Sequence, residues 1–181
     1  MRVITGSVRG RKLQEPVGMD IRPTTDQVKE ALFNIIQFDI EGRRVLDLFA
    51  GTGQLGIEAL SRGAASCLFL DESKKSVDII NENLRRCGFK APVQRCDSLG
   101  YLRGCGRESF DVIFIDPPYG QGLEDKAIET IVEFDILAKG GIMAIETRRE
   151  QSVRAVPPEY GTTKEYRYGK IKLTVISRAT E

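Results

Sequence analysis

A carboxylate, two prolines and an aromatic ring directly follow an apolar run in the middle of the chain. The run is Val112–Ile115, and the tetrad is Asp116, Pro117, Pro118 and Tyr119. Pro117 disfavours helical backbone at Asp116, and proline has no N–H, so carbonyls here can accept hydrogen bonds. The Asp116 carboxylate and the Pro117 carbonyl could accept both hydrogens of an exocyclic amine while Tyr119 stacks on its ring. The tetrad indicates a nucleobase amine, although a plain loop opening after a strand has the same pattern.

A second candidate site lies upstream, where another apolar run ends in a glycine-rich loop. Residues 43–49 predict a strand, Gly51, Gly53 and Gly56 follow, and a helix is expected from residue 57. Glycines let backbone approach a ligand closely, and we expect a side chain at Gly53 to fill that space. A strand, a glycine loop and a helix N-terminus form the usual nucleotide-binding corner of an open parallel sheet.

Three aspartates at predicted strand ends could hold the rest of a nucleotide cofactor. Asp71 follows residues 67–70 and can accept both hydroxyls of a ribose. Asp47 precedes the glycine loop, where a carboxylate suits an ammonium group better than a pyrophosphate, because like charges repel. Asp97 is placed to meet an adenine edge. Asp47 and Asp97 could also brace the loop or cap a helix.

The loop alone does not identify the cofactor. Gly51-x-Gly53-x-x-Gly56, with Asp71 twenty positions after Gly51, also fits the dinucleotide fingerprint. An NAD-dependent oxidoreductase would use the same loop. It would leave the tetrad unexplained, however, and the chain has no histidine for proton transfer.

Together, the loop and the tetrad resemble the class I S-adenosylmethionine-dependent methyltransferases that act on amino groups. Residues 2–13, residues 22–35 and the late Arg167-Tyr168-Gly169 are similar to the RsmD-type family, and the likeness extends over essentially the whole chain. Those enzymes methylate the N2 amine of one guanine in bacterial small-subunit ribosomal RNA. The resemblance implies S-adenosylmethionine as the cofactor and ribosomal RNA, within a small-subunit assembly particle, as the partner.

The residues and the resemblance together assign three sets of site residues. The catalytic set is Asp116, Pro117, Pro118 and Tyr119. The cofactor set is Arg22, Thr24, Asp47, Phe49, Ala50, Gly51, Thr52, Gly53, Leu55, Asp71, Glu72, Asp97 and Ser98. Arg22 and Thr24 suit a carboxylate, and their contact could be with cofactor or with RNA. The RNA-binding set is Arg2, Arg9, Arg11, Lys12, Arg167 and Lys170.

The distribution of charge, rather than its sum, supports contact with RNA. The formal net charge is only +1, but residues 1–12 contain four cations and no acid. Gly6 and Gly10 suggest a flexible hairpin that sets these cations on phosphates. A second basic cluster surrounds Tyr166 and Tyr168. A solvated charged face is the plain interpretation of either cluster, and phosphate contacts alone would not select a base.

Composition excludes several other classes of protein. With 181 residues, 41% of them hydrophobic, the chain can form one domain with a real core. The four cysteines include no C-x-x-C pair and, without histidine, no metal site is expected. No apolar run approaches the roughly 20 residues of a membrane span, so we expect a cytoplasmic protein. We also expect a monomer, because no spare apolar surface is evident.

Strands alternate with helices after residue 40, which predicts a parallel α/β sheet. We expect a single Rossmann-like domain with a mostly parallel seven-stranded sheet, comprising an N-terminal β-hairpin arm (1–21) and a catalytic core (22–181). The first helix is expected to start at Thr24 or Thr25, and Thr24 and Gln27 are spaced as a capping box. As the resemblance implies, residues 163–166 and 171–176 form an antiparallel edge hairpin turning at 168–170.

Two further functions remain open at this stage. The tetrad suits any aromatic amine, so methylation of adenine N6 or cytosine N4 in DNA is the nearest alternative, weakened by the lack of a separate DNA-reading domain. A catalytically inactive RNA-binding protein would use only the basic arm. A methyltransferase of this kind needs no strong base, because the methylated, cationic nitrogen is acidic, so the missing histidines are consistent with it.

Overall fold

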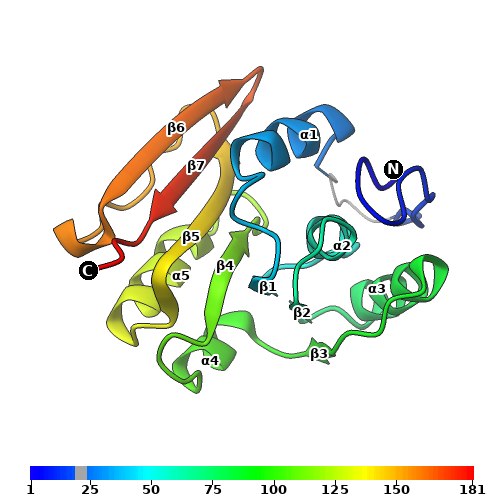
Figure 1. Ribbon diagram of the computed structural model, residues 1–181, viewed down its shortest axis with the longest axis horizontal. Coiled ribbons are helices and arrows are strands. Elements are labelled where there is room, and N and C mark those ends of the chain that lie inside the picture. Colours follow the sequence, from blue (N-terminus) through cyan, green and yellow to red (C-terminus); the bar gives the residue numbers. More distant parts are fainter. Residues whose placement is uncertain (19–23) are drawn as a thin grey trace.

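The computed structural model describes residues 1–18 and 24–181, and it confirms the predicted α/β class (Figure 1). The helices are α1 (Asp26–Ile35), α2 (Gln54–Ser61), α3 (Lys74–Cys87), α4 (Ser98–Arg103), α5 (Leu123–Glu133) and the 3₁₀ turn η1 (Pro158–Tyr160). The strands are β1 (Arg44–Asp47), β2 (Ser66–Asp71), β3 (Val93–Arg95), β4 (Phe110–Ile115), β5 (Leu137–Arg148), β6 (Thr162–Tyr168) and β7 (Ile171–Ser177).

The seven strands form one sheet in the order β3-β2-β1-β4-β5-β7-β6. β1 to β5 run parallel, whereas β7 pairs antiparallel with both β5 and β6. The chain runs outward from β1 to β3 and then returns to place β4 beside β1. In open α/β sheets, ligands bind outside the carboxyl ends of the strands at such a reversal of order. The topology therefore directs attention to the ends of β1 and β4.

Each face of the sheet has its own apolar core. On one face, α1, α2 and α3 pack on alternate residues of the strands, including Val45, Phe69 and Phe114. On the other, α4 and α5 pack on the intervening residues, including Leu46 and Ile113. Both faces are covered, which explains why the parallel strands read as continuous apolar runs rather than alternating ones.

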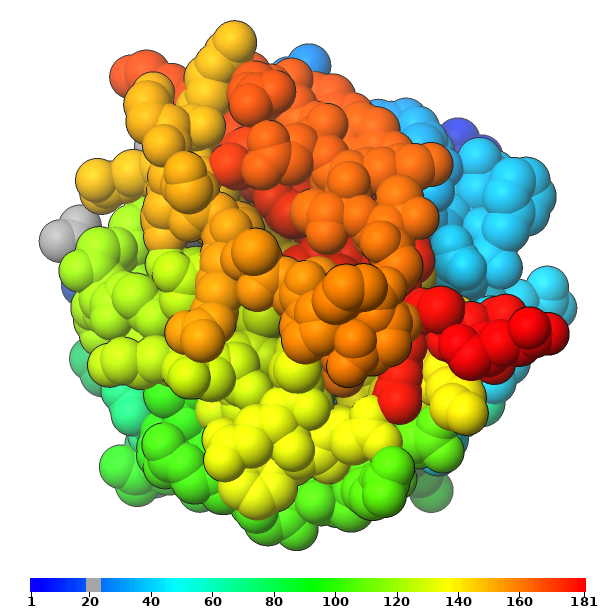
Figure 2. All heavy atoms as spheres, turned by 90° about the vertical axis from the view of Figure 1, so that its left-hand side faces the viewer, coloured from blue at the N-terminus to red at the C-terminus, as the bar shows by residue number. Residues whose placement is uncertain are grey.

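The predicted C-terminal edge hairpin is confirmed, with its turn at Gly169 and Lys170. β6 is the outer strand, and most of its side chains are exposed, among them Lys164, Glu165 and Arg167. Charged side chains on an edge strand oppose pairing with another sheet. Figure 2 looks onto this edge and shows β6 and the segment that follows β5 spread over the surface above α5.

The first helix is capped by the second of the two threonines expected at its start. Thr25 is the N-cap of α1, and its hydroxyl accepts a hydrogen bond from the amide of Val28 at 3.3 Å. The predicted capping box between Thr24 and Gln27 is therefore wrong. The hydroxyl of Thr24 instead points to carboxyl groups at the end of the sheet.

The N-terminal arm folds back on itself, but it is anchored rather than flexible. Its hairpin is joined by an antiparallel bridge between Arg2 and Lys12, and it buries Val3 and Leu13. The buried carboxylate of Glu58 on α2 accepts hydrogen bonds from the amides of Ile4 at 2.9 Å and of Thr5 at 3.0 Å. An unpaired buried carboxylate is costly, so these bonds and the cations nearby fix the arm against α2.

Lys29 fastens the other side of the arm. Its ammonium donates to the carbonyl of Arg2 at 2.6 Å and lies 3.9 Å from Glu58, and both side chains are fully buried. Burial lowers the pKa of Lys29, and the charge of Glu58 opposes that shift. Arg62 adds a second cation, 3.0 Å from Glu58. The arm, α1 and α2 therefore share one polar junction.

The four cysteines are free thiols, and Cys67 and Cys87 are buried in the core. Within residues 1–18 and 24–181, no group of three or more His, Cys, Asp or Glu side chains is arranged to hold a metal ion. In the same part of the chain, no helix is both long enough and apolar enough to cross a membrane.

The close contact of α2 with β2 depends on Gly56. A Cβ at this position would lie 2.3 Å from Phe69 Cε1 and 2.7 Å from Cys67 Sγ. We expect Gly56→Ala to lower the free energy of unfolding by about 1–3 kcal/mol, the usual cost of overpacking, in urea denaturation at neutral pH. Gly104→Ala is the control, since its Cβ would come no closer than 3.6 Å to another residue. Equal stability of the two variants would contradict this role of Gly56.

Candidate active site

Four carboxyl groups gather at the carboxyl end of the sheet. Asp47 and Asp71 end β1 and β2, Asp116 follows β4, and Glu146 lies near the end of β5. The pairing of Ile115 with Ile145 sets Asp116 beside Glu146 on the same face. All four groups therefore lie where the topology predicts a ligand, and the sequence analysis identified three of them.

The glycine loop is held in place by two of these carboxylates. The amide of Gly51 donates to Asp71 at 2.9 Å, and that of Gly56 donates to Asp47 at 3.0 Å. Gly53 is the N-cap of α2 in left-handed backbone, with a φ of 79°. The loop is consequently shaped before any ligand binds.

The glycines of this loop do not share one role. A Cβ at Gly51 would meet nothing within 4 Å, so its open side is where a ligand can approach the backbone. A Cβ at Gly53 would instead lie 3.2 Å from Ile80, in the core beneath the loop. A side chain at Gly53 would point toward the core. This does not support the expectation that it would fill the space for the ligand. Gly51 is the position that faces open space.

Asp47 is buried, and its environment changes its acidity. Burial raises its pKa to about 7, the bond from Gly56 opposes that rise, and the nearby charge of Asp71 adds to it. A cation placed opposite Asp47 would favour the ionised form. Asp47 therefore braces the loop, as its alternative interpretation suggested, and it also suits a positively charged ligand group.

Asp71 and Asp97 both have backbone partners. The second oxygen of Asp71 accepts from the amide of Ser73 at 2.9 Å. Asp97 is the N-cap of α4 and accepts from Gly100 at 3.1 Å, while Ser98 donates to the carbonyl of Leu48 at 2.5 Å. Each carboxylate oxygen can accept more than one hydrogen bond, so these contacts are compatible with the predicted ligand roles.

The other predicted cofactor residues differ in exposure. Phe49 is half-buried and Glu72 is exposed at the end of β2, whereas Ala50, Thr52 and Leu55 are buried. The side chain of Leu55 belongs to the core, so its contribution to the site is limited to its backbone and to packing. The predicted cofactor residue Arg22 lies outside the described residues.

The tetrad opens from β4 as predicted. Pro117 is buried, Pro118 is exposed, and Tyr119 is half-buried. The guanidinium of Arg148 lies 5.0 Å from the centre of the Tyr119 ring, and the Tyr119 hydroxyl is 3.5 Å from Glu146 Oε1. Tyr119 is thus placed beside Asp116 with one ring face near a cation, a position from which a base could be stacked.

Asp116 has a perturbed environment. Burial is the largest influence that raises its pKa well above the ordinary value, the charges of Glu146 and Asp47 add to it, and a hydrogen bond from Thr24 opposes it. Strongly shifted carboxyl groups in a cleft are candidates for chemistry.

The sequence analysis missed Glu146. The signal was available, because Ile142–Ile145 is an apolar run followed by an acid, just as Val112–Ile115 is followed by Asp116. Parallel neighbouring strands with the same pattern bring the two acids together. Thr24 was identified, but its contact is with the acids Asp116 and Glu146.

The predicted RNA-binding cations lie on two exposed features. Arg2, Arg9, Arg11 and Lys12 are exposed on the arm, and Arg167 and Lys170 are exposed at the tip of the β6–β7 hairpin. In the view of Figure 1, α1 lies between the arm and this tip.

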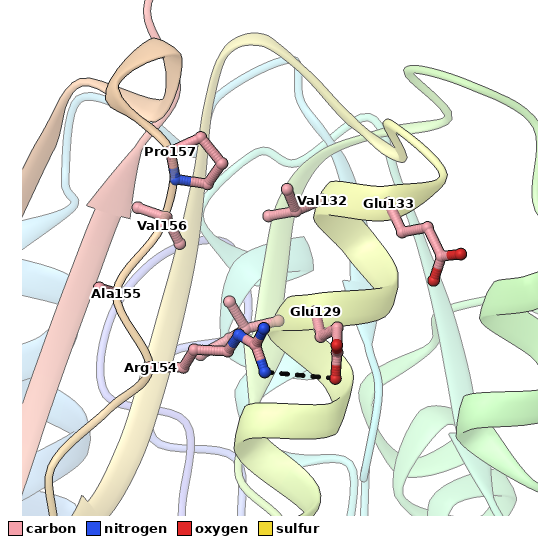
Figure 3. A pocket seen from close by; sticks show the side chains of 8 residues that line it. Glu129, Val132, Glu133, Arg154, Ala155, Val156 and Pro157 are labelled. Atoms are coloured by element: carbon pink, nitrogen blue, oxygen red, sulfur yellow. Dashed lines mark ion pairs between the residues drawn. The ribbon is translucent and has the colours of Figure 1, made fainter.

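A separate groove of about 540 Å³ lies between α5 and residues 154–157 (Figure 3). Arg154 and Glu129 face each other across it, 3.4 Å apart. Among the described residues, none of the predicted site residues lines this groove.

Comparisons with known proteins agree with the geometry. The family model described as conserved hypothetical protein 95 matches residues 1–177. The Escherichia coli protein named ribosomal RNA small subunit methyltransferase D is 32% identical over 182 residues, covering 100% of this chain and 91% of that protein. Its Haemophilus influenzae counterpart is 37% identical over 166 residues, covering 90% and 85%.

Among solved structures, the candidate methyltransferase yhhF from Escherichia coli has a TM-score of 0.88 at 30% identity, covering 100% of this chain and 99% of that one. The agreement confirms the expected Rossmann-like class I fold. The chain therefore belongs to the family of the ribosomal RNA small subunit methyltransferase D proteins.

Proposed function

We propose that this chain transfers the methyl group of S-adenosylmethionine to the exocyclic N2 amine of a guanine in small-subunit ribosomal RNA. The observation that carries the proposal is the position of Asp116, Pro117, Pro118 and Tyr119 at the carboxyl end of β4, beside the glycine loop at the end of β1. One crevice then serves both reactants. Family membership supports methylation of small-subunit ribosomal RNA, because the relatives are named for it.

The loop and its carboxylates fit an adenosine cofactor with an amino-acid part. Open space above Gly51 admits a ligand to the backbone, and Asp71 lies within hydrogen-bond distance of that loop. Asp47 would face the ammonium group, and Asp97 and Ser98 would border the adenine. When bound, the cofactor supplies a methyl group attached to a sulfonium. The sulfur of the sulfonium is a good leaving group.

The protein must activate a weak nucleophile, because the lone pair of an aromatic amine is delocalised into its ring. Asp116 and the carbonyl of Pro117 would accept the two amine hydrogens and draw the nitrogen toward tetrahedral geometry. Tyr119 would stack on the guanine and hold the amine at attack distance. Asp116 then stabilises positive charge that develops only as the N–C bond forms, which is the condition for raising the rate.

The raised pKa of Asp116 suits the last step of the reaction, in which the methylated nitrogen loses a proton. Burial, Glu146 and Asp47 all make this carboxylate a stronger base than an exposed one. The methylated nitrogen is acidic and loses its proton to such a base. The same residue can therefore stabilise the charge and accept the proton, and no histidine is needed.

Recognition of RNA falls to the arm and the hairpin tip. The cations Arg9, Arg11 and Lys12 are exposed on an arm anchored through Glu58, which favours a fixed orientation toward phosphates. Arg2 would join them, and Arg167 and Lys170 would form a second contact.

We further propose that the chain acts as a monomer and as one domain, with residues 1–21 as the arm. Its acceptor would be a small-subunit assembly particle in the cytoplasm.

The first prediction from the proposed function concerns the catalytic carboxylate. Asp116→Ala should lower turnover by on the order of 10²–10³, the scale for removing one preorganised charge-stabilising group, and should change cofactor affinity by less than about threefold. Single-turnover methyl transfer and calorimetry measure the two effects. Asp78→Asn, at an exposed position of α3, is the control. Turnover near that of wild type would rule out the role of Asp116.

The second prediction tests whether Gly51 of the glycine loop faces the cofactor. Gly51→Ala should weaken S-adenosylmethionine binding by about tenfold or more, because its Cβ would occupy the ligand space, and should cost about 1–2 kcal/mol of stability for left-handed backbone. Gly88→Ala is the matched control, since Gly88 also has positive φ and an open Cβ position but lies at the end of α3.

Calorimetry measures the affinity of both glycine variants for S-adenosylmethionine and for NAD. The proposal expects binding of S-adenosylmethionine by wild type and by Gly88→Ala. Unchanged affinity in Gly51→Ala, or a preference for NAD, would contradict the cofactor assignment.

The third prediction concerns the arm. Neutralising Arg9 and Arg11 together, each to Gln, should reduce the slope of log affinity for RNA against log salt concentration by about 1–2. It should also raise KM with little change in kcat, because phosphate contacts orient the substrate without entering the chemistry. Lys139→Gln, at the amino end of β5, is the control. An unchanged salt slope would remove the arm from the RNA interface.

A further inference from the structure

The side-chain amide of Asn83 joins α3 to two other segments of the protein. Asn83 is fully buried. Its Nδ2 donates to the carbonyl of Thr52 at 2.9 Å and to the carbonyl of Gln14 at 3.2 Å, and its Oδ1 accepts from the amide of Gln14 at 2.6 Å. Gln14 belongs to the arm, whereas Thr52 belongs to the glycine loop. One side chain therefore contacts both the predicted RNA-binding arm and the predicted cofactor loop.

An amide is the group that these three contacts require. Asparagine has two N–H donors and one carbonyl acceptor. The two donors face carbonyls and the acceptor faces an amide, so each polar group of Asn83 has a partner. Turning the amide over would set its oxygen against two carbonyls, so the contacts also fix its orientation. An apolar residue here would deprive polar groups of both segments of their partner, which is costly in a buried position.

The contact with Thr52 fixes one peptide group of the glycine loop. The carbonyl of that peptide accepts from Asn83, and its N–H, which belongs to Gly53, donates to the carbonyl of Ala50 at 2.8 Å. Helix α3 supports the loop at a second point, because Ile80 lies 3.2 Å from where a Cβ of Gly53 would be. The shape of the loop therefore depends on α3 and on the orientation of Asn83.

The arm lies beside the same helix and reaches the loop directly. Burial raises the pKa of Cys87, and the charge of Arg11 opposes that rise, so Arg11 lies near α3 about one turn beyond Asn83. At the start of the arm, the hydroxyl of Thr52 donates to the Sδ of Met1 at 3.5 Å. Figure 1 shows the arm next to α2 and α3. Both limbs of the arm's hairpin thus end beside the glycine loop.

Release of the arm would remove two of the three hydrogen bonds of Asn83. A buried amide that loses its partners either turns to find others or remains unsatisfied, and both outcomes cost free energy. Either outcome weakens the hold of Asn83 on Thr52. A displaced loop would in turn free the amide to turn away from Gln14. The docked arm and the shaped loop therefore stabilise each other.

We propose that Asn83 is a positioning residue that links the arm to the glycine loop, so that S-adenosylmethionine bound at the loop fixes the arm in its docked position. The inference deepens the proposed function and rests on it, because it takes the loop as the cofactor site and the arm as the RNA contact. The docked arm presents Arg9 and Arg11 to phosphates. By linkage, RNA on the docked arm strengthens cofactor binding by the same factor as the cofactor strengthens RNA binding.

The first test needs no RNA. Hydrogen exchange of arm amides in the full chain is followed by NMR with and without S-adenosylmethionine. The probes are Val3 and Leu13, whose amides donate to carbonyls within the arm. A ligand that binds only the docked state slows their exchange, by up to about a hundredfold at 100 times Kd if the linkage is complete. We expect slowing of about fivefold or more in wild type. Unchanged exchange with the cofactor bound would overturn the proposal.

Substitution of Asn83 tests its role in the link. Asn83→Ala should abolish the slowing when each protein is measured at the same multiple of its own Kd, and it should weaken S-adenosylmethionine binding by about tenfold. Asn81→Ala, at an exposed position of the same helix, is the matched control. Leu84→Ala controls for lost stability, because its apolar side chain packs in the core and forms no hydrogen bond.

The slowing should persist in both control variants. Slowing that also persists in Asn83→Ala, or that disappears in Leu84→Ala as well, would overturn the role of Asn83. The comparison of wild type with and without cofactor remains decisive if Asn83→Ala does not fold.

Affinity for RNA separates this inference from the proposed function. Small-subunit ribosomal RNA is titrated with and without S-adenosylhomocysteine, which occupies the cofactor site but has no methyl group to transfer. Wild type and Asn81→Ala should bind RNA about fivefold or more tightly with it, and Asn83→Ala should show no difference. RNA binding that is equally tight with and without it in wild type would overturn the coupling. If wild type binds no RNA, the proposed function is contradicted, and the exchange measurement alone decides whether the arm and the loop are linked.

Discussion

Parallel strands end at the same edge of a sheet, and in this protein that edge collects carboxyl groups that repel one another. Asp47, Asp71, Asp116 and Glu146 lie there because β1, β2, β4 and β5 all run in the same direction. A fold that buries or half-buries such charges must satisfy each of them. Backbone amides of the glycine loop serve Asp47 and Asp71, and the Thr24 hydroxyl serves Asp116 and Glu146. The shape of the loop and the position of α1 both follow from this requirement.

The same crowding gives the site its chemistry. Burial and neighbouring charges raise the pKa values of Asp47 and Asp116, so these two are better proton acceptors than exposed carboxylates, and they attract positive charge. Both properties suit a reaction in which a cationic cofactor delivers a methyl group and the accepting nitrogen becomes cationic before it loses a proton. A site of this kind needs few functional groups beyond carboxylates, carbonyls and an aromatic ring. The lack of histidine in the chain is consistent with such chemistry.

Local patterns predicted the parts of this structure that depend on nearby residues. The strand and the glycine loop that follows it were expected from an apolar run and its glycines, and the C-terminal hairpin was expected from the family resemblance. The predictions that failed concern contacts between distant segments. Thr24 was expected to cap a helix, but two carboxyl groups distant in sequence take its hydroxyl. The arm was expected to be flexible, but a buried glutamate on α2 anchors it.

Side-chain direction explains the remaining differences. Three glycines in one loop looked equivalent in the sequence, yet their Cβ positions face open space, the core or a neighbouring strand. Glu146 was overlooked because a single acid after an apolar run is common, and its meaning appears only when the register of β4 and β5 sets it beside Asp116. The local signals therefore located the site, while the pairing of strands determined which groups work together in it.

The most direct test of the central claim is transfer of a labelled methyl group from S-adenosylmethionine to small-subunit particles, naked ribosomal RNA and DNA, followed by nucleoside analysis. The account predicts N2-methylguanosine from an RNA acceptor, and the better acceptor identifies the substrate state. Label on adenine or cytosine would contradict the substrate assignment, and no label on any acceptor would contradict the assignment of this site to methyl transfer.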